Sequence, residues 1–182
     1  MRILFIIKFV FLSFVSISQD YIIHELIRFD KPIELKVSEH KKQNAKIAEI
    51  CSFHEQFRID SLKIYLDIFY YKKPIYPSSY EQLLYKLKKE EEVVNKEFSQ
   101  NIVRLSDEIR KNQNKVKACI IKRKNVYSRG GELYVVKYYT YIEGNWLEMD
   151  FIGPIAQRTN IDYLFDQIFN SIKKIEKDKK KK

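Results

Sequence analysis

GELYVVKYYTYIEGNWLEMDFIGP, residues 131–154, is the stretch that decides the fold of this chain. Aromatic and β-branched residues fill it and a turn sequence at 143–145 divides it, so it predicts two long strands joined in a hairpin. The first strand, 132–142, is apolar on both faces, which is typical of a central strand covered on both sides. In the second strand one row is formed by Leu147, Met149 and Phe151, and the other by Trp146, Glu148, Asp150 and Ile152.

The next stretch, NIDYLFDQIFNSIKK at residues 160–174, predicts an amphipathic helix capped by Thr159 or Asn160. Its large apolar residues recur at intervals of three and four, so they share one stripe. Because these side chains cannot remain in water, we expect the helix to pack on the sheet. The stripe consists of Ile161, Leu164, Phe165, Ile168, Phe169 and Ile172.

Earlier segments predict further strands, because apolar and polar residues alternate in them. The alternation is clearest in residues 62–71, and Pro74 and Pro77 end this segment. The predicted strands are 33–37, 47–57, 62–71 and 116–124.

A helix is predicted between the strands 62–71 and 116–124. Ser79 and Gln82 form a capping box, with Ser78 and Glu81 as the alternative register. Residues 99–115 fit either a continued helix or a strand, and a short strand or irregular link is favoured. The apolar stripe of the helix is Leu83, Leu84, Leu87, Val94 and Phe98.

This order of elements predicts an α+β fold, a mostly antiparallel sheet with flanking helices. The sequence also resembles PsbP/DcrB-like α/β/α domains, which end in a hairpin, a G-x-x-W-like turn, a strand closing near Gly or Pro, and a helix finishing in "SI". The resemblance implies such a sandwich over residues 46–174, with an accessory or binding role and no shared catalytic residues. Segment 19–45 has no counterpart in it and is expected to be an N-terminal extension. The matching residues are Gly144, Trp146, Gly153, Pro154, Ser171 and Ile172.

Residues 1–18 have the layout of a secretory signal peptide, with Arg2 before an apolar run and small residues at the end. The predicted cut follows Ser18, which places the mature protein in the periplasm or outside the cell. The run is about 15 residues long and contains Lys8, whereas a membrane span needs about 20 apolar residues. An uncleaved N-terminal anchor is the alternative; after cleavage, no transmembrane span is expected.

The formal net charge of +10 is concentrated at the two ends of the chain. The tail at 175–182 is rich in lysine, and residues 19–172 mix acids and bases. No nucleic-acid-binding motif is present, so specific nucleic-acid recognition is not expected. The tail itself predicts a second way of binding, by electrostatic attachment to anionic lipid or polysaccharide.

Candidate chemistry is sparse. His24, His40 and His54 lack metal-ligand spacing, and neither a metal nor another cofactor is expected. Glu148 and Asp150 share one strand face about 7 Å apart and are the candidate acid–base pair of a hydrolase-type enzyme. The favoured alternative is that a basic residue on the neighbouring strand, such as Lys137, offsets both charges.

The two cysteines, Cys51 and Cys119, permit one disulfide in an oxidising compartment, and two buried free thiols fit equally well.

Aromatic residues crowd the 131–154 hairpin and form a candidate binding face for a protein partner. Cross-strand packing beneath the helices is the favoured alternative. The sequence therefore predicts an exported, single-domain, non-enzymatic protein that binds another macromolecule in the cell envelope or outside the cell. The candidate face is Tyr134, Tyr138, Tyr139, Tyr141 and Trp146.

Overall fold

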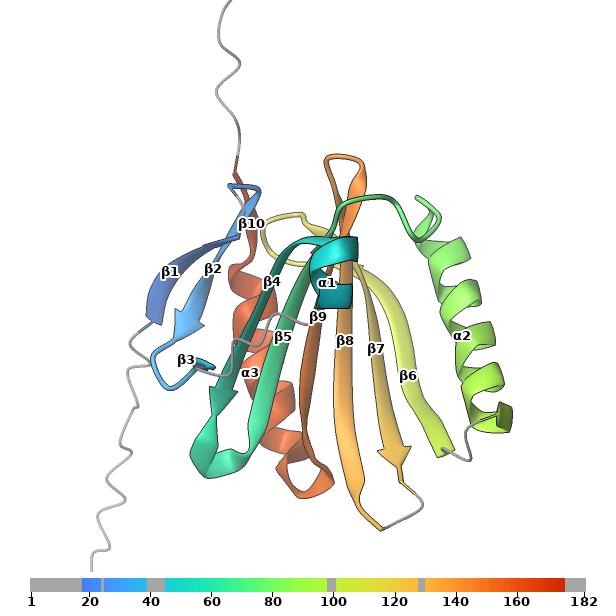
Figure 1. The fold of residues 1–182 in the computed structure, drawn as a ribbon. Helices are drawn as coiled ribbons and strands as arrows, with labels where there is room; N and C mark the ends of the chain where they lie inside the picture. The colour runs from blue at the N-terminus through green and yellow to red at the C-terminus, as the bar shows by residue number, and fades with distance from the viewer. Residues whose placement is uncertain (1–17, 24, 39–44, 98–100, 128–129, 176–182) are drawn as a thin grey trace, which may run out of the picture.

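The fold was obtained as a computed structural model, which describes residues 18–23, 25–38, 45–97, 101–127 and 130–175. A seven-stranded antiparallel sheet forms its centre, with strand order β3-β4-β5-β9-β8-β7-β6 (Figure 1). The strands are β3 (Lys36–Val37), β4 (Cys51–Ile59), β5 (Ile64–Tyr71), β6 (Asn101–Lys111), β7 (Lys117–Val126), β8 (Glu132–Ile142) and β9 (Asn145–Pro154).

A smaller sheet stands beside the large one, in the order β1-β2-β10. Its strands are β1 (Ser18–Ile23), β2 (Ile27–Pro32) and β10 (Lys173–Lys174). The two ends of the described chain therefore meet in one sheet, where both β1 and β10 pair antiparallel with β2. A further hydrogen bond, 2.9 Å from the Ile175 amide to the Leu26 carbonyl, extends this contact.

Helices cover the large sheet on opposite faces. Helix α3 (Arg158–Ser171) lies behind the sheet in Figure 1 and packs on the main apolar core, whereas α2 (Tyr80–Glu97) lies beside β6 and β7. A short helix, α1 (Ala45–Ile50), leads into β4, and 3-10 turns at Asp60–Leu62 and Ile155–Gln157 precede β5 and α3. This arrangement confirms the predicted α+β class, with mostly antiparallel sheets and flanking helices.

The hairpin of β8 and β9 has the two-sided character that its sequence predicts. Leu147, Met149 and Phe151 belong to the core under α3, and Trp146 belongs to the smaller cluster on the α2 face. The turn between the strands uses positive φ angles at Glu143 and Gly144. The alternation in β9 therefore divides its side chains between two different interiors.

The segment 19–45 was expected to be an N-terminal extension, and its described part contributes side chains to the core of the domain. Apolar side chains from it, including Phe29 and Leu35, are fully buried in the same core as α3. Strand β3 also joins the large sheet through pairing with β4. The domain therefore includes the residues from β1 onward, because the core needs their side chains.

Two predicted strands are divided differently in the structure. The predicted strand 33–37 is a turn at 33–34 followed by β3, and Ile33 and Val37 are exposed while Leu35 is buried. The predicted strand 47–57 begins as α1, since Ala45–Ile50 contains good helix formers and Ile50 is half exposed, and it continues as β4 from Cys51.

Residues 101–111 form the long edge strand β6 where a short strand or irregular link was favoured. An edge strand buries few side chains, so its sequence carries only a weak alternation. Helix α2 starts as predicted, with the Gln82 amide donating to Ser79 Oγ at 3.4 Å. Helix α3 begins at Arg158 rather than after Thr159 or Asn160, and Gln157 at its start makes no side-chain capping bond.

The predicted signal segment lies outside the described residues apart from Ser18, the first residue of β1, and the predicted tail lies outside them apart from Ile175. Within the described residues, no helix is long and apolar enough to cross a membrane.

Candidate functional site

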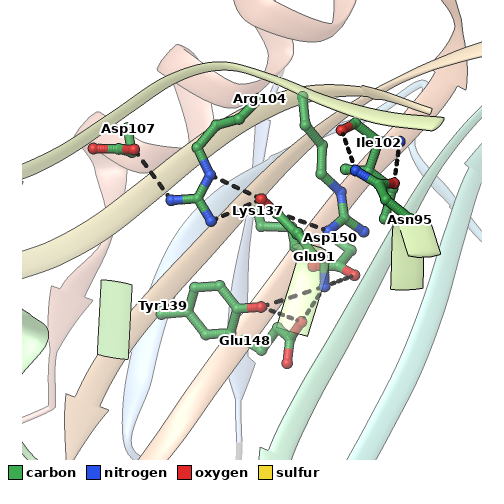
Figure 2. A network of polar contacts seen from close by, with 10 residues as sticks. Glu91, Asn95, Ile102, Arg104, Asp107, Lys137, Tyr139, Glu148 and Asp150 are labelled. Atoms are coloured by element: carbon green, nitrogen blue, oxygen red, sulfur yellow. Dashed lines mark hydrogen bonds and ion pairs between the residues drawn. The ribbon is translucent and has the colours of Figure 1, made fainter. Parts of the chain in front are cut away.

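The candidate carboxylates lie on the face of the sheet opposite α3, where they meet Lys137. Strand register places Lys137 of β8 directly opposite Asp150 of β9, and Tyr139 directly opposite Glu148. Lys137 Nζ lies 2.5 Å from Glu148 Oε1 and 2.7 Å from Asp150 Oδ2. A third contact of 3.3 Å reaches the Tyr139 hydroxyl, so all three N–H donors of the ammonium are engaged (Figure 2). The expected offset of both carboxylates by Lys137 is confirmed.

The two carboxyl groups differ in their surroundings. Glu148 also accepts hydrogen bonds from the hydroxyls of Tyr71 and Tyr139. Burial opposes ionisation of Glu148, but Lys137 and these hydroxyls outweigh it and hold the pKa of Glu148 below its ordinary value. Burial raises the pKa of Asp150 to about 7; Lys137 opposes the rise and the charge of Glu148 adds to it. The pair therefore consists of an ionised Glu148 and a carboxyl that takes up a proton more easily.

Burial also affects the basic and phenolic members of the cluster. Burial disfavours the charged ammonium of Lys137, but Asp150 and Glu148 overcome this and raise the pKa of Lys137. The pKa of Tyr139 is raised well above its ordinary value, by burial first and then by the nearby carboxylates. Lys137 therefore stays protonated and Tyr139 stays neutral, so the cluster is an ion-pair network centred on the Lys137 ammonium.

A second ionic network joins α2 to the sheet next to this cluster. Glu91 of α2 pairs with Arg104 of β6 at 2.8 Å and with Arg123 of β7 at 3.2 Å. Arg104 also contacts Asp107 at 3.1 Å. The two networks lie close together on one face of the sheet (Figure 2).

The side chain of Asn95 supports the same junction. Its carboxamide accepts from the Ile102 amide at 2.7 Å and donates to the Ile102 carbonyl at 3.0 Å (Figure 2). A further strand added at this edge would form its hydrogen bonds with these same backbone groups. Asn95 thus occupies one pairing position of the open edge of β6. The sequence alone does not reveal the roles of Glu91, Asn95, Arg104 and Arg123, because only the tertiary fold brings α2 and these strands together.

Concave regions occur on both sides of the sheet, and the described residues line the two that follow. The smaller is a cleft of about 300 Å³ between α2 and strands β7 and β8, with Lys137 and Tyr139 in its wall. The larger is an open groove of about 1110 Å³ on the other side of the molecule, between the turn before β5 and α3. The groove is lined by Pro32, Glu34, Lys36, Ile59, Asp60, Ser61, Leu62, Ile64, Asn160, Tyr163, Leu164 and Gln167.

The candidate aromatic face does not form a surface. Tyr134, Tyr138, Tyr139 and Trp146 are each at most 1% exposed, and Tyr141 is half-buried. Trp146 donates through its ring N–H to the Pro77 carbonyl at 3.0 Å and packs edge-on against neighbouring rings. The interpretation as an exposed binding face is therefore wrong, because β8 and β9 are covered on both sides and their rings fill the two interiors.

The two cysteines are free and buried. Cys51 lies in β4 and Cys119 in β7, and three strands separate them in the sheet. That separation is about 19 Å at about 4.8 Å per strand, far beyond the reach of a disulfide. Burial is the main cause that raises the pKa of Cys51 to about 11 and that of Cys119 to about 12. Of the two alternatives, the structure contains the buried thiols.

Among the described residues, no three His, Cys, Asp or Glu side chains gather in a way that could hold a metal ion. His54 instead stacks on Phe69, with ring centroids 4.7 Å apart.

Fold and site together define an α+β sandwich of the PsbP type. The chain is similar to the solution structure of cyanobacterial PsbP (CyanoP) from Synechocystis sp. PCC 6803, with a TM-score of 0.62 at 14% sequence identity. The match covers 87% of this chain and 92% of that one. No family model and no curated protein matches the sequence. The likeness confirms the PsbP-like fold that the 131–174 stretch predicts.

Proposed function

We propose that this chain is an exported, non-enzymatic binding protein that recognises another macromolecule in the cell envelope or outside the cell. The open groove of about 1110 Å³ carries the proposal, because most of its accessible surface is apolar. Apolar side chains that remain accessible in a groove are typical of protein-recognition sites.

The acid–base pair supports a binding role better than a catalytic one. Lys137 engages both carboxylates, and Glu148 receives two further hydroxyl donors. A general acid or base must be able to reach a substrate proton, and Glu148 is 3% exposed. The network therefore serves the stability of the sheet.

Tyr163 is the side chain through which the groove proposal is best tested. It lines the groove, stands on α3 and is 64% exposed, so its replacement does not open the core. Tyr85 on α2 is 67% exposed and does not line the groove, which makes it a matched control.

The experiment is a crosslinking pull-down with residues 19–182 against the envelope fraction of the producing cell. We expect one protein to be enriched by the wild type and by Tyr85→Ser, and to be lost with Tyr163→Ser. Equal enrichment by both variants would contradict the groove as the recognition surface.

A version ending at Ile175 separates this proposal from attachment through the lysine tail, and it keeps the pairing of β10 with β2 intact. Enrichment that needs the tail and disappears at high salt would assign the binding to the lysines. Turnover on a hydrolase panel that Glu148→Gln or Asp150→Asn removes would overturn the non-enzymatic proposal.

A further inference from the structure

The outer edge of β6 is the longer of the two edges of the large sheet. β6 stands at one end of the strand order, and among the described residues only β7 pairs with it (Figure 1). The strand at the other end, β3, has two residues, whereas β6 has 11. An edge strand presents a row of backbone N–H and C=O groups to which a further strand can bind. The edge of β6 is therefore the place where this sheet could be extended.

The first half of this edge is already occupied. Asn95 pairs with the amide and the carbonyl of Ile102, so these backbone groups point outward. In an antiparallel strand, the backbone groups of every second residue point to the same side. The extra residue of the β-bulge between Arg104 and Ser106 moves this alternation by one position. Beyond the bulge, the odd-numbered residues of 107–111 therefore turn their backbone groups to the open edge.

The side chains along this second half of β6 are ordered by charge. Two acidic residues, Asp107 and Glu108, precede Ile109, and two basic residues, Arg110 and Lys111, follow it. All four charged side chains remain at least partly exposed. If this segment pairs antiparallel with a copy of itself about Ile109, an acidic residue meets a basic residue at each charged position. Opposite charges in directly opposed positions stabilise a strand pair.

The same register agrees with the two faces of the sheet. Directly opposed residues of antiparallel strands lie on one face. Arg110 lies over the Phe169 ring of α3 at 4.6 Å, so Glu108, two positions away, also lies on the α3 face. Asp107 and Lys111 lie on the other face, which α2 covers. Each acidic residue therefore meets its basic counterpart on the same side of the extended sheet.

The ion pairs within one molecule leave these contacts possible. Arg110 pairs with Asp166 at 3.1 Å, and Asp107 pairs with Arg104 at 3.1 Å. A guanidinium has five N–H donors and a carboxylate has several acceptor positions, so both groups can take a further partner. A second copy would add ion pairs without displacing those already present.

Neighbouring registers place like charges together. The alternation of the outward backbone groups permits shifts of two residues only. A shift in one direction places Glu108 opposite Glu108 of the second copy, and a shift in the other direction places Arg110 opposite Arg110. Like charges in directly opposed positions destabilise a strand pair. Charged edge strands often prevent pairing altogether, whereas the charges of β6 permit one register.

We infer that residues 107–111 of β6 pair antiparallel with the same residues of a second copy of this chain, about a two-fold axis at Ile109. Backbone hydrogen bonds then join Ile109 to its copy and Asp107 to Lys111, and the two large sheets form one continuous sheet. Because the same segment serves on both sides, the contact closes at a dimer.

The test is sedimentation velocity of the protein in the form that its cell produces. Because a pairing of five residues forms a small and weak interface, the protein is measured from about 10 μM to about 1 mM. We expect the fraction of dimer to rise with concentration. A protein that is monomeric at every concentration overturns the inference.

Two charge-reversed variants test the register. Lys111→Asp places acidic residues opposite each other at two positions, and Asp107→Lys places basic residues opposite each other there. Each variant alone is expected to dimerise about tenfold more weakly or worse. An equal mixture of the two restores opposite charges and is expected to form a heterodimer as strong as the wild-type dimer. A mixture of cooperatively folded variants that stays as monomeric as each variant alone would contradict the register.

Lys36→Asp is the matched control. It makes the same charge change on β3, the edge strand at the other end of the sheet, where Lys36 is also exposed. We expect its dimer to be as strong as that of the wild type. A dimer that is lost in Lys36→Asp and kept in Lys111→Asp would place the interface at β3 and overturn the inference.

Discussion

The two faces of the central sheet hold their helices in different ways. Helix α3 places five of its 14 residues in the main apolar core, and Phe165 and Phe169 stack within it at 5.5 Å. Helix α2 buries two of its 18 residues and is joined to the sheet by Glu91 and Asn95. Apolar contacts therefore hold α3 against the sheet, whereas polar and ionic contacts hold the second half of α2.

This contrast predicts where stability is concentrated. Buried apolar side chains contribute strongly to the free energy of unfolding. Removing one of them leaves a cavity, because a close-packed interior cannot collapse fully around the missing side chain. Partly exposed ion pairs contribute little, although a fully buried one becomes costly to break. The variants below test the contrast on matched residues of the two faces.

The largest effect is expected from Phe165→Ala on α3. Phe165 is fully buried, stacks on Phe169 and meets Phe151 edge-on at 5.4 Å. Its loss should lower the free energy of unfolding by about 4 kcal/mol, measured by urea denaturation. Leu87→Ala on α2 is the comparison and should cost about 2 kcal/mol. A greater loss for Leu87→Ala would reverse the proposed ranking of the two faces.

Lys137→Met should come next, with a loss of about 3 kcal/mol near pH 7.5. The change leaves Glu148 and Asp150 buried without their cation, and protonation of Asp150 relieves part of the cost. The loss should therefore shrink at acidic pH, which denaturation at several pH values would show.

Lys122→Met is the control for that variant. Lys122 also lies on the sheet and pairs with Asp162 of α3 at 2.8 Å, but both partners are more exposed. A more exposed pair contributes about 0–1 kcal/mol. If both lysine variants lost the same stability, burial would not explain the importance of Lys137.

The elements with strong internal patterns could be predicted from the sequence. The side chains of β5, β9 and α3 pack against one continuous core. The spacing of apolar residues in the sequence therefore shows the period of each strand and of the helix. The pairing of Lys137 with Glu148 and Asp150 was also accessible, because a hairpin fixes which residues of neighbouring strands face each other.

Features that depend on distant contacts could not be predicted. The strand β6 lies at the edge of the sheet, and its charged side chains meet α2, which gives no local period. The burial of Tyr134 and Trp146 depends on α3 and α2 covering both faces, so composition alone could not separate an aromatic surface from an aromatic core. In the described part of segment 19–45, β2 pairs with β10, near the other end of the chain, and β3 pairs with β4.

The pH dependence of stability should reveal Asp150. Its pKa of about 7 in the folded protein lies above the ordinary value, so the folded state binds this proton more tightly than the unfolded state. The contribution of Asp150 to the free energy of unfolding is therefore at its maximum below about pH 4, and it is lost as the pH rises through about 7.

The measurement is the unfolding free energy of the wild type minus that of Asp150→Asn, from pH 4 to pH 8. The pKa of Asp150 rises from 3.8 to about 7, and one unit of pKa corresponds to about 1.4 kcal/mol, so this difference should fall by up to about 4 kcal/mol. Glu148, whose pKa is lowered, acts in the opposite direction and is present in both proteins. A difference that stays constant with pH would show that Asp150 is ionised throughout.

The smallest effect is expected from Glu91→Gln, which removes the charge that holds two arginines against α2. Glu91 and its partners are largely buried, with side-chain exposures of 12%, 15% and 17%. The loss should be about 1 kcal/mol, since the amide of glutamine keeps one hydrogen bond.

The effect should also be local, because α3 depends on apolar contacts that the change does not touch. Hydrogen exchange is therefore expected to quicken in α2 and stay unchanged in α3. Glu92→Gln is the neighbouring control: Glu92 pairs only with Lys89 on the helix surface, where both side chains are about half exposed, and its loss should leave exchange unaltered. If Glu91→Gln quickened exchange equally in both helices, the ionic junction would support the whole sheet rather than α2 alone, and the contrast between the two faces would fail.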